Sequence, residues 1–157
     1  MTTVININGE MLGQEEAKLS VFDHGFLFGD SVYEVLITYC GIPFKIKEHL
    51  QRMSVSADET GLKLPYTYEG FFREINRTIA AGNNRESYIR IVVTRGVGEI
   101  NIDPSSCLKP NTIIYVSEFS GYPEGLYRDG INLVIVSTRR NIKESINPGI
   151  KTGNYLN

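Results

Sequence analysis

Lys151 stands in a sequence context that could make a lysine a nucleophile. Ile150 precedes it and Gly153 follows two residues later, a pattern typical of a strand end that opens into a turn. In a partly dry pocket an amine gives up its proton more readily than in water, and the neutral amine can attack a carbonyl carbon. A solvated surface lysine is the simpler alternative for any single lysine, so the remaining residues must decide.

His49 and Arg52 form a second candidate group. They are three residues apart in a predicted helix, beside its apolar stripe. A guanidinium there can donate a fork of hydrogen bonds to a phosphate or a carboxylate, and His49 can brace it. The alternative is an arginine that snorkels to solvent next to a packed histidine.

Two predicted strands alternate polar and apolar side chains. Tyr88 and Arg90 share one face, and the isoleucines between and after them share the other. The polar face either meets solvent or lines a site for a carboxylate. Tyr33 and Glu34 point to opposite faces of their strand, so one of the two must point inward.

The elements that would position these residues can be predicted from periodicity. An Asn8-Gly9 turn predicts a hairpin over residues 4–12. Apolar residues at helical spacing predict one helix over 46–60 and a second that is capped by Thr67 and ends near Gly82, with Phe71, Phe72, Ile75 and Ile79 on its inner face. The other predicted strands are 32–39, which forms a hairpin with 44–46, and then 88–94, 111–118 and 131–136.

Strands and helices occur in runs rather than in strict alternation. This order favours an α+β fold, with two helices on one side of an antiparallel sheet. The segment from Ser120 to Gly125 breaks the periodicity. We therefore expect an N-terminal α+β domain at residues 1–118, a linker at 119–130, and at 131–157 the incomplete beginning of a second, β-rich domain that binds a cofactor.

The bulk composition excludes several classes of protein. Of the 157 residues 41% are hydrophobic and 22% charged, the formal net charge is −2, and the longest basic run is Arg139-Arg140. This pattern argues against nucleic-acid and membrane partners. No segment resembles a membrane span or a leader peptide, so a cytoplasmic protein is expected. Two cysteines and two histidines predict neither a disulfide framework nor a metal site.

In their order along the chain, the motifs resemble the class IV (fold type IV) pyridoxal phosphate enzymes. This family comprises branched-chain aminotransferases, D-amino acid aminotransferases and aminodeoxychorismate lyases, and the resemblance extends over essentially the whole chain. The motifs that carry it are Asn6-Ile7-Asn8-Gly9-Glu10, Phe22-Asp23-His24-Gly25, Phe28-Gly29-Asp30-Ser31-Val32-Tyr33-Glu34, Glu48-His49-Leu50-Gln51-Arg52, Tyr88-Ile89-Arg90, Val93-Thr94-Arg95-Gly96-Val97-Gly98 and Ile150-Lys151-Thr152-Gly153-Asn154-Tyr155-Leu156-Asn157.

The resemblance implies roles for three residues at the cofactor. Lys151 would form the Schiff base with pyridoxal 5′-phosphate and then carry the proton between the substrate α-carbon and the cofactor. Schiff-base formation needs an unprotonated amine, and the cofactor acts as the electron sink. Arg52 would bind the 5′-phosphate through its planar, charged fork, and Tyr155 would lie near the 3′-oxygen.

The substrate-side residues mix two signatures. Tyr88 and Arg90 resemble branched-chain enzymes, where they help to hold substrate carboxylates. Tyr33 and Phe28 resemble D-amino acid enzymes, but the arginine and histidine that those enzymes carry after the Thr-Arg-Gly motif are absent from residues 99–102. The expected function is therefore transfer of an amino group between an L-branched-chain amino acid and a 2-oxo acid such as 2-oxoglutarate, by a homodimer.

Three alternatives remain open at this point. Two belong to the same family, a D-amino acid aminotransferase and an aminodeoxychorismate lyase. The third is an inactive fragment that acts only as a folded or dimerising domain. The inactive fragment is considered because the second domain of the family continues well past its lysine, whereas here Lys151 stands at position 151 of 157. By the resemblance, a chain of this length would be inactive by itself.

Overall fold

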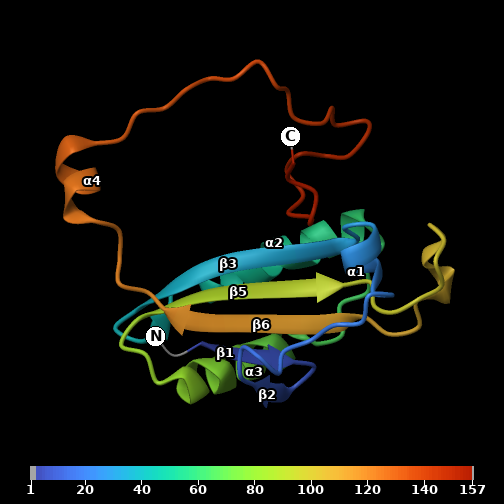
Figure 1. Cartoon of the computed structure of the whole chain (residues 1–157), viewed down its shortest axis with the longest axis horizontal. Helices are drawn as coiled ribbons and strands as arrows, with labels where there is room; N and C mark the ends of the chain where they lie inside the picture. Colours follow the sequence, from blue (N-terminus) through green and yellow to red (C-terminus); the bar gives the residue numbers. More distant parts are fainter. Residues whose placement is uncertain (1–2, 157) are drawn as a thin grey trace.

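The computed structural model describes residues 3–156, and an antiparallel six-stranded sheet dominates it (Figure 1). The strand order is β2-β1-β6-β5-β3-β4, and the long helices α2 and α3 both lie behind the sheet in Figure 1. The elements are β1 (Val4–Ile7), β2 (Glu10–Leu12), α1 (His24–Leu27), β3 (Ser31–Tyr39), β4 (Ile42–Pro43), α2 (Ile46–Glu59), α3 (Tyr68–Gly82), β5 (Ser87–Thr94), the 3₁₀ turn η1 (Pro104–Ser106), β6 (Asn111–Glu118) and α4 (Glu124–Asp129). The predicted α+β class is confirmed.

Both predicted hairpins form, each around two residues with left-handed backbone. Asn8 has φ 55° and Gly9 φ 95°, and Cys40 and Gly41 have φ 51° and 73°. Such turns match the right-handed twist of the strands that they join. Because the second turn returns the chain at once, its strand is Ile42–Pro43, which is earlier than the sequence predicts.

Local capping groups set the limits of α3. The Thr67 hydroxyl accepts a hydrogen bond from Gly70 N at 3.2 Å, and α3 ends at Asn83 in the left-handed conformation, φ 48°. These predicted ends are confirmed. The inner position predicted for Phe72 is wrong, since its side chain is 44% exposed. One residue beyond buried Phe71, it is turned about 100° around the helix, away from the sheet.

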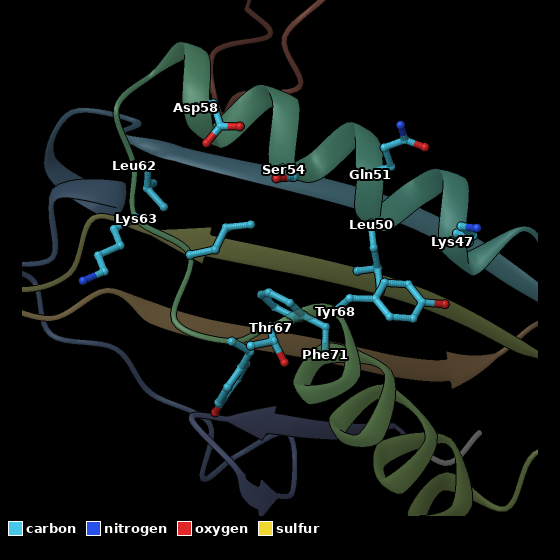
Figure 2. A pocket seen from close by; sticks show the side chains of 12 residues that line it. Lys47, Leu50, Gln51, Ser54, Asp58, Leu62, Lys63, Thr67, Tyr68 and Phe71 are labelled. Carbon is cyan, nitrogen blue, oxygen red and sulfur yellow. The ribbon is translucent and has the colours of Figure 1, made fainter.

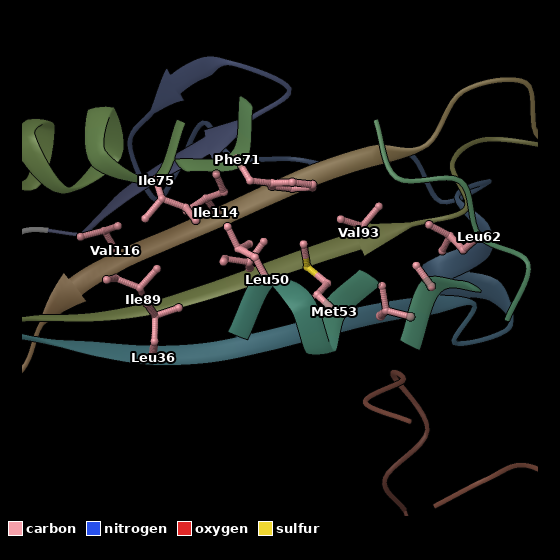
Figure 3. Close-up of a cluster of buried hydrophobic side chains, with 13 residues drawn as sticks. Leu36, Leu50, Met53, Leu62, Phe71, Ile75, Ile89, Val93, Ile114 and Val116 are labelled. Carbon is pink, nitrogen blue, oxygen red and sulfur yellow. The ribbon is translucent and has the colours of Figure 1, made fainter. Parts of the chain in front are cut away.

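A single apolar core fills the space between the helices and the sheet (Figure 3). Every second residue of β3 and of β5 points into it, as the period of a strand requires. Each fully buried side chain of this size contributes about 1.5–3 kcal/mol. The members are Val32, Leu36, Leu50, Met53, Ala57, Leu62, Phe71, Ile75, Ile89, Ile91, Val93, Ile114 and Val116.

A buried polar network joins β1 to α3 beside this core. Asn6 Nδ2 donates to Glu74 Oε2 and to Thr78 Oγ1, both at 3.1 Å, and Asn6 Oδ1 accepts from Gly9 N at 2.7 Å. Burial raises the pKa of Glu74, but hydrogen bonds from Asn6 and Arg77 outweigh this effect and hold the pKa below its ordinary value. The network therefore fixes the first hairpin to the helix layer.

The predicted strand at 131–136 is wrong. These residues have no regular structure, and Ile135 is fully exposed at 100%. A strand needs a neighbour for its backbone groups, and within residues 3–156 no strand pairs with this segment. The predicted linker holds the short helix α4, while the domain limits at 118 and 130 remain a prediction. In the described part of the chain no helix is long and apolar enough to cross a membrane.

Replacing Asn6 by alanine should lower the free energy of unfolding by about 1–3 kcal/mol, because two buried acceptors and one backbone donor each lose a hydrogen bond. Urea unfolding measures this change. The matched control is Asn76→Ala on α3, where the bond lost is the one to Phe72 O in the same helix. There the loss should stay within about 0.5 kcal/mol. Equal losses in the two variants would contradict the network.

Stability should also depend on pH through Glu74. Because its folded pKa lies below the unfolded value, its contribution is complete above about pH 4.3 and is lost as pH falls through the folded pKa. Unfolding free energies measured from pH 6 downward should therefore decline less steeply in Glu74→Gln than in the unsubstituted chain. Parallel curves for the two proteins would exclude this role.

Candidate active site

Backbone hydrogen bonds hold Lys151 between the edge of the sheet and α2. Tyr33 N donates to Lys151 O at 2.9 Å, and Lys151 N donates to Ser56 Oγ at 3.2 Å. Gly153 N adds a bond to Ser31 O at 3.0 Å. In Figure 1 the red end of the chain returns to β3 and α2 at this place. Lys151 is therefore attached to the α+β layer although it is distant in sequence.

The side chain of Lys151 lies against two tyrosine rings. Its Nζ is 4.1 Å from the centre of the Tyr33 ring and 5.6 Å from that of Tyr155. The two rings meet edge to face with centres 5.6 Å apart, and the Arg90 guanidinium lies 4.3 Å from the Tyr33 ring. The structure therefore brings together four of the residues singled out from the sequence.

The polar face of β5 is the sheet face opposite the helices. Ile89 and Ile91 are buried in the core, whereas Tyr88 and Arg90 line a shallow hollow of about 400 Å³ on the other side. Thr3, Val92, Tyr115 and Ser117 complete its lining. The Arg90 guanidinium, which lines this hollow, also lies over the Tyr33 ring. Binding of a carboxylate at this face stays a prediction.

Glu34, and not Tyr33, is the inward-pointing member of its pair. Its side chain is 0% exposed and takes a fork from Arg52, with Nε to Oε1 at 2.5 Å and Nη2 to Oε2 at 2.7 Å. His49 Nδ1 lies 2.8 Å from Oε2. This pairing is not among the sequence predictions. The sequence feature that could have indicated this ion pair is an acidic residue on the inner side of a strand, followed by a helix with a histidine and an arginine three residues apart.

The charges of this group support one another. Burial raises the pKa of Glu34, but hydrogen bonds and charge from Arg52 and His49 prevail and keep the pKa below the ordinary value. The hydrogen bond to Glu34 raises the pKa of Arg52 against the effect of burial, and Tyr155 raises it further.

Arg52 keeps a free side for a second anion. Its side chain is 52% exposed although its fork is bound, because Glu34 engages only Nε and Nη2. A guanidinium carries five N–H donors. Nη1 is thus the nitrogen that could bind a phosphate while the other two hold the helix to the strand.

Two features lie apart from this group. Phe28 packs edge-on against His24, with ring centres 4.9 Å apart, rather than against Lys151 or its tyrosines. A hollow of about 740 Å³ opens between α2 and the start of α3 (Figure 2), lined by Lys47, Leu50, Gln51, Ser54, Asp58, Leu62, Lys63, Leu64, Tyr66, Thr67, Tyr68 and Phe71. It contains none of the predicted site residues, so its size does not make it the active site.

Known protein sequences resemble this chain. The family model described as "Amino-transferase class IV" matches residues 31–157. The putative branched-chain-amino-acid aminotransferase of Methanocaldococcus jannaschii is 42% identical over 98% of this chain and 52% of its own length. The D-alanine aminotransferase of Staphylococcus haemolyticus is 34% identical over 98% of this chain and 55% of its own length. The chain thus spans about half the length of these curated relatives.

Solved structures share the fold. The branched-chain aminotransferase of Escherichia coli superimposes with a TM-score of 0.87 at 26% identity, over 96% of this chain and 51% of that one. The branched-chain aminotransferase of T.th., with pyridoxamine 5′-phosphate, gives 0.70 at 28% identity over 76% and 40%. The 4-amino-4-deoxychorismate lyase of Pseudomonas aeruginosa gives 0.67 at 26% identity over 81% and 44%. Fold and sequence agree, and the chain belongs to the class IV aminotransferase family.

Proposed function

We propose that this chain supplies the lysine and the phosphate-binding arginine of a pyridoxal phosphate-dependent transaminase. The observation that carries the proposal is the position of the Lys151 amine against the rings of Tyr33 and Tyr155. The Lys151 backbone contacts α2, the helix on which a buried carboxylate holds Arg52. The amino donor proposed is an L-branched-chain amino acid and the acceptor a 2-oxo acid. A relative named as a branched-chain aminotransferase supports this choice of substrate.

The residues present fit pyridoxal 5′-phosphate. Lys151 offers an amine, Arg52 a nitrogen, Nη1, that Glu34 does not engage, and Tyr155 a hydroxyl on a ring beside the amine. When bound, the cofactor supplies a carbonyl carbon for the amine and an electron sink for the carbanion at the substrate α-carbon. These three residues are the ones that would hold its aldehyde, phosphate and 3′-oxygen.

The side chains of this chain would then divide the remaining work. The Lys151 amine would take the proton from the substrate α-carbon and return it, as a positioned base and acid. The rings of Tyr33 and Tyr155 would cover the amine and exclude water from it. Arg90, next to Tyr33, would hold a substrate carboxylate by a charge-assisted fork, with Tyr88 beside it.

The family alone supports the remaining parts of the proposal. A homodimer and a cytoplasmic location are expected because of the resemblance. The second candidate donor is D-alanine, since D-alanine aminotransferases are 34% identical over nearly the whole chain. A lyase is a third candidate because a 4-amino-4-deoxychorismate lyase shares the fold.

Labelling tests the role of Lys151. After incubation with pyridoxal 5′-phosphate and reduction with borohydride, peptide mass mapping should find the phosphopyridoxyl mass on Lys151 at about ten times the level on exposed Lys109 or more, because a bound aldehyde reacts at high effective concentration. Lys151→Arg should remove this excess and leave Lys109 unchanged. Equal labelling of the two lysines in the unsubstituted chain would refute the assignment.

The donor is tested separately, in a polypeptide that carries this chain at the length of its relatives. With L-leucine and 2-oxoglutarate, glutamate should form at about ten times the rate seen with D-alanine or more, a difference of about 1.4 kcal/mol in transition-state free energy. Amino acid analysis of the mixture measures both rates. A faster reaction with D-alanine would reverse the choice of donor, and a lyase product without glutamate would exclude transfer.

A further inference from the structure

Ser56 makes the direct contact between α2 and the candidate catalytic lysine. It is 2% exposed, and its hydroxyl oxygen accepts the backbone N–H of Lys151 at 3.2 Å. The proposed function assigns no role to this serine. A buried N–H that loses its acceptor is costly, so the bond ties the position of the Lys151 backbone to that of α2.

The place of Ser56 on the helix connects it to Arg52. The two residues are four apart on α2, so their side chains leave the same side of the helix with Cβ atoms about 5–6 Å apart. Glu34 holds this turn of α2 to β3 through Arg52. One rigid turn of helix thus carries both the contact to the lysine and the candidate contact to the phosphate.

The lysine segment also fits tightly against β3. Thr152 pairs with Val32 in an isolated antiparallel bridge. A Cβ atom at Gly153 would come within 2.6 Å of Ser31 Oγ, closer than such atoms approach, and within 3.1 Å of Gly29 O, which is tighter than most such contacts. The neighbours Ile150 and Thr152 are buried, so the alternation of a strand turns Lys151 outward. The register of this segment therefore has little freedom.

We propose that Ser56 is a positioning residue for Lys151, a role that rests on the proposed function. Its hydroxyl sets the backbone of Lys151 against α2 and thereby sets the separation between the Lys151 amine and the Arg52 guanidinium. A phosphorylated aldehyde must reach both groups at once. Without the hydroxyl the amine remains, but its spacing from Arg52 is no longer fixed, and a small misplacement is enough to weaken joint binding.

Amide hydrogen exchange measures the contact directly. In Ser56→Ala the Lys151 amide should exchange about 3 to 10 times faster than in the unsubstituted chain, as expected for the loss of one hydrogen bond. The amides of Ile89 and Ile91 in the central strand β5 should not change, which separates this effect from a general loosening of the fold. Ser54→Ala, two residues away on α2, is the matched control. Unchanged exchange at Lys151 would overturn the proposal.

The second measurement compares pyridoxal 5′-phosphate with pyridoxal, which lacks the phosphate. The ratio of their borohydride-trapped labelling rates at Lys151 reports how far the arginine is used together with the amine. Ser56→Ala should lower this ratio about tenfold, toward the value for Arg52→Lys, while labelling by pyridoxal stays within about twofold. Ser54→Ala should keep the full ratio. A full ratio in Ser56→Ala would show that the serine does not position the lysine.

Two further variants keep the test decisive. Ser56→Thr retains the hydroxyl and should restore both the slow exchange and the ratio. Gly153→Ala displaces the lysine segment from its own side without altering α2, and should reproduce both effects if Ser56→Ala does not fold; normal values there would overturn the proposal. Failure of the proposed function looks different, because Lys151 would then escape preferential labelling in the unsubstituted chain, whatever its amide exchange shows.

Discussion

A carboxylate with no access to water governs this structure. Glu34 lies on the core side of β3, and an ionised group in that place must be paired, because its desolvation would otherwise cost several kcal/mol. Only Arg52 and His49 satisfy it among the residues described. The Glu34–Arg52 ion pair requires α2 to lie over β3 with the helix side that carries Arg52 turned toward Glu34. Since the Arg52 side chain is half exposed, the Glu34–Arg52 ion pair contributes less to stability than a fully buried pair would. Its larger consequence is that it fixes the orientation of α2 on β3.

The candidate active site follows from this constraint. Once α2 is fixed over β3, Ser56 faces the edge of the sheet, where the backbone of Tyr33 also offers a hydrogen bond. The segment with Lys151 occupies both contacts, and its amine lies against the rings of Tyr33 and Tyr155. Neighbouring residues of β3 thus take part in two different interactions. Glu34 forms the buried ion pair with Arg52, and the ring of Tyr33 contacts the Lys151 amine.

Local chemistry made much of the fold predictable. Left-handed turn residues at Asn8-Gly9 and Cys40-Gly41, and the Thr67 cap, act within a few residues, so the sequence alone places them. The wrong predictions concern residues whose structure depends on packing against a distant part of the chain. Residues 131–136 have the composition of a strand but no neighbouring strand within residues 3–156, and Phe72 matches an apolar stripe that only the orientation of the helix against the sheet could divide into buried and exposed members.

The sequence by itself determined the family, because an ordered set of motifs can be read directly from the order of the residues. It also supplied the candidate site residues, whose roles stay predictions. It also showed that Tyr33 and Glu34 face opposite ways. Only the tertiary structure decided that the carboxylate points inward, that Arg52 serves it, and that Lys151 meets α2 through Ser56, 95 residues earlier. Those contacts depend on how separate elements pack together, which no local period encodes.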